Sequence, residues 1–184
     1  MKEILFALWF FLPAGVANAA PIFAAKLPVV KYWDLPIDVH RTYRGIRLLG
    51  DHKTWRGLAV GILMATVVLA LQQFLVRRYG WAQTLTAQVD YKTLPTLALG
   101  PLFGLGALGG DAIESFFKRQ RRIEPGRGWF PFDQTDYIVG GAIATAPFVS
   151  LSFWQYGWLL LLWLLVHMVS SYIGYLCGLK ERPI

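Results

Sequence analysis

Long apolar stretches separated by shorter polar connections dominate the pattern of this 184-residue chain. A helix that crosses a bilayer needs about 20 mostly apolar residues, and several of the stretches approach that length. The pattern therefore predicts an all-α integral membrane protein, a single bundle of about five transmembrane helices with no separate soluble domain. The predicted spans are Ile4–Ala25, Gly57–Val76, Thr93–Ala112, Tyr137–Phe153 and Trp158–Gly178.

The third and fourth predicted spans are rich in small residues, as in the runs GPLFGLGALGG and GGAIATA. Small side chains allow helices to approach one another closely inside a membrane. The fifth span is instead filled with Leu and Trp (WLLLLWLLV), which is typical of a helix that faces lipid. We therefore expect the third and fourth helices to pack tightly in the bundle.

Charge is sparse in this chain and unevenly distributed. Only 16% of the residues are charged, against about a quarter in a typical soluble domain. Most of the charge lies in two segments, Asp34–Gly57 and Gly109–Asp136, which overlap the loops expected at residues 26–56 and 113–136. The net charge of +7 suits anionic lipid headgroups or a phosphorylated substrate, and beside apolar spans nucleic acid is not an expected partner.

The distribution of Lys and Arg predicts the orientation of the chain, because basic residues favour cytosolic connections. The first and third connections are strongly basic, the turn Trp154–Gly157 carries no charge, and the tail contains Lys180 and Arg182. We expect a cell-membrane protein with its N-terminus outside and its C-terminus and both charged segments in the cytosol. The run Ala17–Ala19 resembles a signal-peptide cleavage site, but cleavage would leave the new N-terminus on the wrong side of the membrane.

The second charged segment contains the residue types of a metal and phosphate site. If it continues the third helix, four polar residues share roughly one helix face until Pro125–Gly126 ends the helix. Asp133 and Asp136 begin the next helix at a spacing that points them the same way. If Asp111 faces them, three carboxylates meet beside two cations, which suits Mg²⁺ bound to substrate phosphates. In the simpler alternative, Asp136 only caps the fourth helix and the basic run only anchors lipid headgroups. The four residues on the helix face are Asp111, Ser115, Lys118 and Arg119.

The first charged segment places cations and hydroxyls in a turn-rich loop. Such a loop can wrap around a triphosphate, with backbone N–H groups adding contacts. The segment contains no P-loop motif, and from spacing alone a solvated basic loop explains the pattern equally well.

Three motifs in order carry a resemblance to a known family. They read PIDxxxTxRGxRLxGDHKTWRG, GDxxxSFFKR and PGxxWFPFDQxD. With them the chain resembles the archaeal CDP-archaeol synthases, which are integral-membrane cytidylyltransferases, from LPAGVANAAP near the N-terminus to LCGLK near the C-terminus. The second charged segment also resembles the signature of CDP-diacylglycerol synthases.

The resemblance implies that the cytidylyl group of CTP is transferred to a lipid phosphate, such as an archaeal di-isoprenyl glycerol ether phosphate, with Mg²⁺ as cofactor. The implied catalytic residues are Asp111, Lys118, Arg119, Asp133 and Asp136. The implied metal ligands are Asp111, Asp133 and Asp136. The implied nucleotide-binding residues are Asp38, Arg44, Lys53, Thr54, Arg56 and Ser115.

Two other functions fit the composition less well. A CDP-alcohol phosphotransferase would carry a DGxxAR motif, which the chain lacks. A small transporter or a membrane-assembly subunit is the non-enzymatic alternative, but a transporter would bury charge near the bilayer midplane. Here the spans are largely free of charge except for His167, which we expect to face the bundle interior, and the charged residues collect on one face of the membrane.

Overall fold

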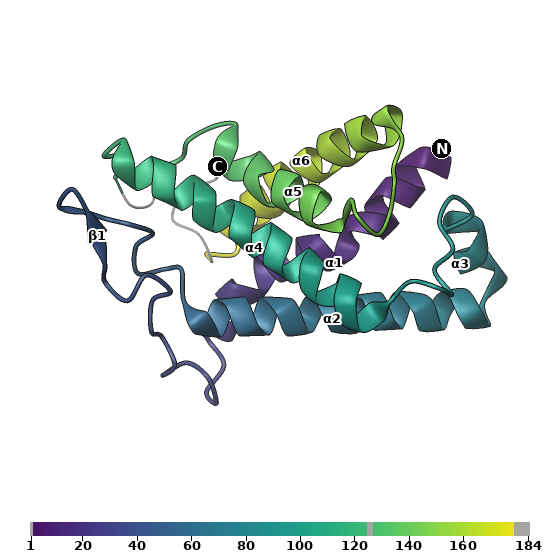
Figure 1. Cartoon of the computed structure of the whole chain (residues 1–184), viewed down its shortest axis with the longest axis horizontal. Coiled ribbons are helices and arrows are strands. Elements are labelled where there is room, and N and C mark those ends of the chain that lie inside the picture. Colours follow the sequence, from purple (N-terminus) through teal and green to yellow (C-terminus); the bar gives the residue numbers. More distant parts are fainter. Residues whose placement is uncertain (1, 125–126, 179–184) are drawn as a thin grey trace.

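The computed structural model describes residues 2–124 and 127–178 and forms an elongated helical bundle (Figure 1). Four of its helices, α1, α2, α4 and α6, are long and apolar enough to cross a membrane. The prediction of an all-α integral membrane fold is thus confirmed. The helices are α1 (Lys2–Ala24), α2 (Trp55–Arg78), α3 (Gly80–Leu85), α4 (Thr96–Gln120), α5 (Phe132–Thr145) and α6 (Phe153–Leu176). A small hairpin joins β1 (Thr42–Tyr43) to β2 (Ile46–Arg47).

The predicted fourth span, Tyr137–Phe153, differs in its bounds from the helix that the structure shows. Helix α5 begins at Phe132 and ends at Thr145, so it has only 14 residues. It ends there because Pro147 lacks the backbone N–H that would continue the helical hydrogen bonds. At about 1.5 Å of rise per residue, α5 is about 21 Å long, which is shorter than the apolar core of a bilayer.

Two other helices also differ from their predicted bounds. Helix α4 continues past Ala112 to Gln120, so residues 113–120 belong to the helix and not to the loop predicted at 113–136. Helix α6 begins at Phe153 because Ser152 and Gln155 form a capping box, in which each side chain meets the backbone N–H of the other. The expected turn at Pro125–Gly126 and the basic tail residues lie outside the described residues.

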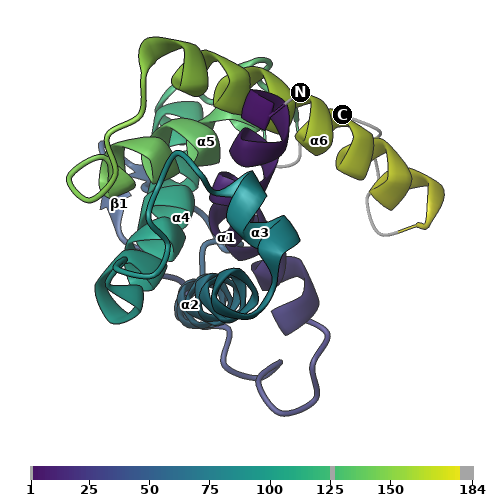
Figure 2. The ribbon, with the colours of Figure 1, turned by 90° about the vertical axis from the view of Figure 1, so that its right-hand side faces the viewer.

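Helix α1 forms the centre of the bundle and contacts every other helix (Figure 2). Phe6, Phe10 and Phe11 are buried on it, and the rings of Phe10 and Phe11 pack against aromatic rings of α4 and α6. Pro13 has no N–H to donate to the carbonyl of Trp9 one turn earlier. The side-chain amide of Gln72 on α2 donates to that carbonyl instead, at 2.6 Å, so the backbone group stays satisfied inside the bundle.

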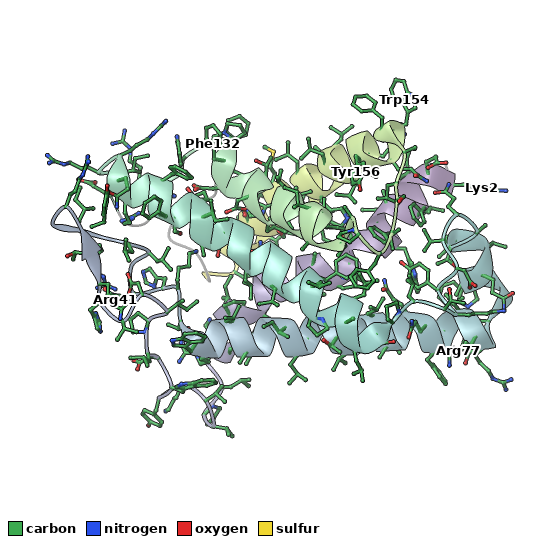
Figure 3. The ribbon with its side chains drawn as sticks, in the orientation of Figure 1. Lys2, Arg41, Arg77, Phe132, Trp154 and Tyr156 are labelled. Atoms are coloured by element: carbon green, nitrogen blue, oxygen red, sulfur yellow. The ribbon has the colours of Figure 1, made fainter. Side chains whose placement is uncertain are left out.

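The helices alternate in direction, which places one end of each close to the β-hairpin. This hairpin end contains the C-terminal ends of α1, α4 and α6 and the N-terminal ends of α2 and α5 (Figure 1). Arg41 lies at this end, whereas Lys2, Arg77 and Trp154 lie at the opposite end (Figure 3). Both charged segments of the sequence therefore meet at one end of the bundle.

Candidate active site at the hairpin end

Close packing of α4 against α5 creates the acidic part of the site. A Cβ added to Gly140 on α5 would lie 2.2 Å from the carbonyl oxygen of Gly106 on α4, so only glycine permits this approach. Small residues on the two helices thus allow their backbones to touch, and the predicted close packing is observed. As a result, the polar end of α4 lies directly beside the first turns of α5.

Three carboxylates meet where these two helices cross. Ligand oxygens of Asp111, Glu114 and Asp136 all lie within 4.8 Å of one another. Asp111 and Glu114 are three residues apart on one face of α4, and Asp136 faces them from α5. Sequence reasoning missed Glu114, although its spacing from Asp111 was a usable signal.

The unsatisfied oxygens of this cluster indicate that it can hold a cation. Glu114 is only 7% exposed, and among residues 2–124 and 127–178 its Oε1 accepts no hydrogen bond. The same holds for Oδ2 of Asp136. A buried acceptor without a hydrogen bond is costly even where a cation lies 3.8 Å away, as Lys118 does from Glu114, and a divalent cation with oxygen ligands removes that cost. The acidic cluster therefore fits a hard divalent ion.

The contacts of Asp133 differ from those expected of a metal ligand. Its Oδ1 accepts a 2.7 Å hydrogen bond from Nζ of Lys118, and its Oδ2 accepts one from the backbone N–H of Trp129 at 2.6 Å. Lys118 lies 3.8 Å from Glu114 Oε1, so the same ammonium also faces the acidic cluster. Asp133 thus holds Lys118 at the edge of the site while Glu114 takes the third position in the cluster.

A second lysine joins the two charged segments. Nζ of Lys53, just before α2, donates to both carboxylate oxygens of Asp111 at 2.7 Å. These residues are 58 positions apart in the sequence. No local pattern could have predicted that they form an ion pair.

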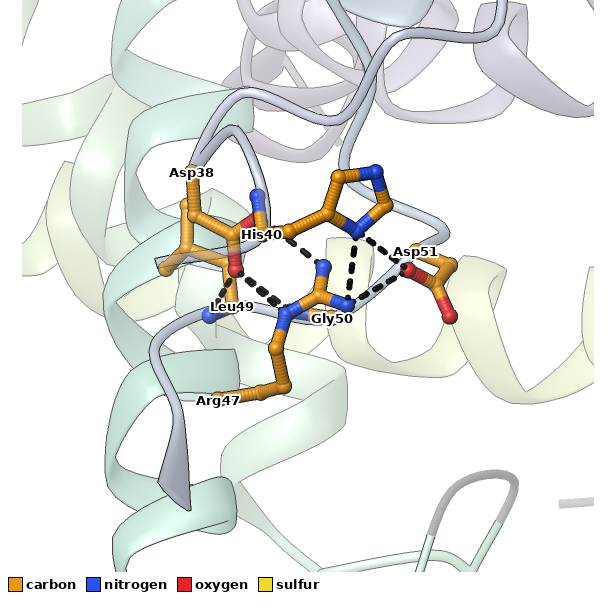
Figure 4. A network of polar contacts seen from close by, with 6 residues as sticks. All are labelled: Asp38, His40, Arg47, Leu49, Gly50 and Asp51. Atoms are coloured by element: carbon orange, nitrogen blue, oxygen red, sulfur yellow. Dashed lines mark hydrogen bonds and ion pairs between the residues drawn. The ribbon is translucent and has the colours of Figure 1, made fainter. Parts of the chain in front are cut away.

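Asp38 organises the loop that carries β1 and β2 (Figure 4). It accepts hydrogen bonds from Nε and Nη2 of Arg47 at 3.2 and 2.9 Å, and from the amides of Leu49 and Gly50 at 3.0 and 3.3 Å. Burial alone would raise the pKa of Asp38, but these hydrogen bonds outweigh it and lower the pKa from 3.8 to about 2. Arg47 also pairs with Asp51 at 2.8 Å. Asp38 is therefore fully occupied within the loop.

The remaining predicted nucleotide ligands have structural contacts in this loop. Thr54 caps α2 by accepting from the N–H of Gly57 at 3.1 Å. Arg56 donates to the carbonyl of Lys31 at 2.5 Å and is buried. Arg44 lies at the hairpin turn with φ of 53°, stacked over the ring of Tyr43. Their direct role in binding a nucleotide stays a prediction.

A polar cavity of about 370 Å³ brings most of the candidate residues together. It receives residues from the loop, from α4 and from α5, and four of its side chains are Lys or Arg. Sequence reasoning missed Arg47, whose side chain is oriented by contacts that no local spacing reveals. The lining residues are Arg47, Leu49, Gly50, Asp51, His52, Lys53, Asp111, Glu114, Ser115, Lys118, Arg119, Asp133 and Asp136.

The polar cavity continues into an apolar groove between α1 and α6. A space of about 270 Å³ shares Lys53 and Asp111 with the cavity and reaches Asn18 and His167. From Asn18 and His167 a groove of about 360 Å³ runs along the two helices, lined mostly by apolar side chains. His167 stacks near the ring of Tyr137, with centroids 5.6 Å apart, so it faces the bundle as predicted.

Comparison with known proteins places this architecture in one family. The family model for CarS-like CDP-archaeol synthase matches residues 1–184, the full chain. The chain belongs to the CDP-archaeol synthase family. It is similar to the CDP-archaeol synthase of Thermococcus kodakarensis, with 33% identity over 100% of this chain and 98% of that protein. The protein of the same name from Halorubrum lacusprofundi is 37% identical over 96% of this chain and 95% of its own.

A solved structure supports the same assignment for the fold. It is described as an intramembrane enzyme for archaeal membrane lipids biosynthesis, and it superposes with a TM-score of 0.67 at 29% identity. The match covers 90% of this chain and 92% of the other. The family that the sequence motifs predicted is therefore confirmed, and the helical arrangement is shared with an enzyme that acts within a membrane.

Proposed function

We propose that this protein transfers the cytidylyl group of CTP to a membrane lipid phosphate, giving a CDP-activated lipid and pyrophosphate. The observation that carries the proposal is a series of three adjoining cavities with shared lining residues, in which a carboxylate cluster and four cations lie at one end and an apolar groove at the other. The polar part suits a triphosphate, and the groove suits the chains of a lipid. Membership of the CDP-archaeol synthase family supports the same reaction.

The reaction needs little chemistry from the protein beyond positioning and charge neutralisation. A phosphate monoester has its second pKa near about 6, so the acceptor oxygen is already a nucleophile at neutral pH. That oxygen forms a bond to the α-phosphorus of CTP. The bond from the α-phosphorus to the bridging oxygen of the β-phosphate breaks, and pyrophosphate leaves with the electron pair. Repulsion between the two anions is the main barrier, and fixed cations reduce it.

The cavity residues divide between these requirements. Asp111, Glu114 and Asp136 would hold Mg²⁺, which would supply positive charge against the substrate phosphates. Lys118, oriented by Asp133, faces the same space and would contact phosphates. The other groups available to the triphosphate are Arg47, Lys53, Ser115 and Arg119.

The apolar groove between α1 and α6 would hold the hydrocarbon chains of the acceptor. Relatives are named CDP-archaeol synthases, so the proposed acceptor is a di-isoprenyl glycerol ether phosphate. Ala19 lines the groove, and Ala19→Phe should raise the KM for the lipid without changing the affinity for CTP. Leu161→Phe, on the exposed face of α6, is the matched control. Equal effects of the two substitutions on the KM for the lipid would mean that its hydrocarbon chains bind outside this groove.

The hairpin end would face the cytosol, where CTP is available, and the N-terminus of α1 would lie outside. The basic residues of the loop before α2 and of the end of α4 gather at this end, which agrees with the preference of Lys and Arg for the cytosolic side.

Pyrophosphate release tests the reaction directly. Purified protein in detergent would be incubated with labelled CTP, Mg²⁺ and either phosphatidic acid or an unsaturated di-isoprenyl glycerol phosphate. We expect release with one lipid, and its loss in Asp111→Asn but not in Asp90→Asn, whose carboxylate lies in the α3–α4 connection. Folded wild-type protein that releases no pyrophosphate with any lipid would contradict the proposal and favour a transport or assembly role.

A further inference from the structure

Lys53 forms an ion pair with a carboxylate that the proposed metal would also need as a ligand. Its ammonium donates to both oxygens of Asp111 at 2.7 Å, and Asp111 belongs to the acidic cluster with Glu114 and Asp136. Mg²⁺ binds oxygen ligands at about 2.0–2.1 Å and uses the same lone pairs. An ammonium that engages both oxygens of Asp111 therefore competes with a divalent ion for this ligand.

The helices that carry the cluster are packed backbone to backbone, so the long side chain of the lysine is the more mobile partner. Asp111 and Asp136 are held on helices whose backbones touch at glycines. The backbone of Lys53 is anchored as well, because its carbonyl accepts from the N–H of Ile37 at 2.7 Å and the next residue caps α2. Its four-carbon side chain is the flexible element, and it is only 21% exposed.

We propose that Lys53 is a positioning residue that exchanges between Asp111 and the phosphates of the nucleotide. When a divalent ion takes Asp111, the released ammonium remains in the cavity beside Arg47 and Arg119, where the triphosphate would lie. The phosphates then replace Asp111 as the partner of the Lys53 ammonium. Divalent ion and nucleotide consequently bind with positive coupling, which by linkage is the same in both directions.

Lys118 lacks this behaviour, which makes the assignment specific to Lys53. The 2.7 Å partner of Lys118 is Asp133, which lies outside the acidic cluster, and its distance to Glu114 of the cluster is longer, at 3.8 Å. A divalent ion on the cluster leaves that hydrogen bond intact. Lys118 therefore stays in place while Lys53 is exchanged.

Metal binding without nucleotide is the first test, and it requires no turnover. Mn²⁺ would be titrated into detergent-solubilised wild type, Lys53→Met, Lys53→Gln and the control Lys92→Met, with free Mn²⁺ read by electron paramagnetic resonance. We expect both Lys53 variants to bind Mn²⁺ about tenfold more tightly than wild type and Lys92→Met, because the competitor is gone. Equal or weaker binding in folded Lys53 variants would overturn the exchange.

A double-mutant cycle on CTP binding in EDTA, with no acceptor lipid, separates exchange from simple charge repulsion. Asp111→Asn should tighten metal-free CTP binding several-fold by releasing Lys53, and this gain should disappear when Lys53 is already Met. An equal gain in both backgrounds would mean that Asp111 merely repels CTP, and would overturn the proposal.

The inference rests on the proposed function, and the two can fail separately. Wild-type protein that binds no CTP with or without Mn²⁺ would refute both. Wild-type protein that binds CTP and Mn²⁺ normally, with no gain in the Lys53 variants, would refute only the exchange.

Discussion

Gly110 of α4 lies directly against the backbone carbonyl of Asp136 of α5. A Cβ at position 110 would be 2.2 Å from that carbonyl oxygen, far inside van der Waals contact. The neighbouring residue on α4 is Asp111, so this contact sets the separation between two carboxylates of the acidic cluster. The absence of a side chain at one position thus determines the geometry of the site.

Gly110→Ala should therefore damage both stability and activity. The added methyl group must push α5 away, which for overpacking costs about 1–3 kcal/mol and lowers the melting temperature by several degrees. A shift of about 1 Å between the carboxylates can reduce activity about 100-fold. Thermal unfolding and pyrophosphate release would measure the two effects.

Gly109 provides the matched control for this substitution. A Cβ at Gly109 meets no atom within 4 Å, so Gly109→Ala adds a methyl group one residue away without a clash. It should leave activity unchanged and slightly raise stability, since Ala favours a helix by about 1 kcal/mol over Gly. Similar losses in the two variants would show that helix conformation, and not the α4–α5 contact, is the cause.

The identity of the third carboxylate can be tested with two conservative substitutions. Glu114→Gln should weaken Mn²⁺ binding by at least about tenfold, because Glu114 lies in the cluster and, among the described residues, its Oε1 accepts no hydrogen bond. Asp133→Asn should change Mn²⁺ binding little and instead raise the KM for CTP, because it releases Lys118. The reverse order of effects would restore Asp133 as the metal ligand that the sequence motif implies.

Asp38 should make the stability of the hairpin loop depend on acid pH. Its pKa in the folded protein, about 2, is below the ordinary value of 3.8, so its contribution is present above pH 3.8 and is lost as the pH falls toward 2. Asp38→Asn should melt at a lower temperature than wild type at neutral pH, since hydrogen bonds to a charged group contribute about 1.5–3 kcal/mol.

The pH dependence of this difference is the decisive measurement. The gap in melting temperature between wild type and Asp38→Asn should narrow as the pH is lowered from 3.8 to about 3, because Asp38 then takes up a proton in the unfolded chain before it does so in the folded protein. A gap that stays constant over this range would mean that the carboxylate charge of Asp38 contributes nothing to stability.

The single cysteine of the chain can report the orientation in the membrane. Cys177 is exposed and follows α6 at the hairpin end. A membrane-impermeant maleimide should label it in inside-out vesicles and not in intact cells. In a Cys177→Ser background, Lys2→Cys at the opposite end should show the reverse pattern (Figure 3). Labelling of Cys177 from outside would invert the proposed topology.

The sequence alone was sufficient for the features that depend on local pattern. Apolar runs of bilayer length predicted five spans, of which four correspond to helices long enough to cross a membrane, and small-residue runs predicted the close contact of α4 with α5. Motif order identified the family and most residues that line the polar cavity. These features are readable because helix formation and burial depend on neighbours three or four positions away.

Tertiary structure alone decided which of these residues act together. Glu114 and Asp133 both carry carboxylates at suitable helical spacing, and only the crossing of α4 over α5 placed the first in the cluster and the second against Lys118. The pairing of Lys53 with Asp111 joins residues 58 positions apart. Such contacts depend on how closely distant helices approach and how loops are capped, and no local periodicity encodes either.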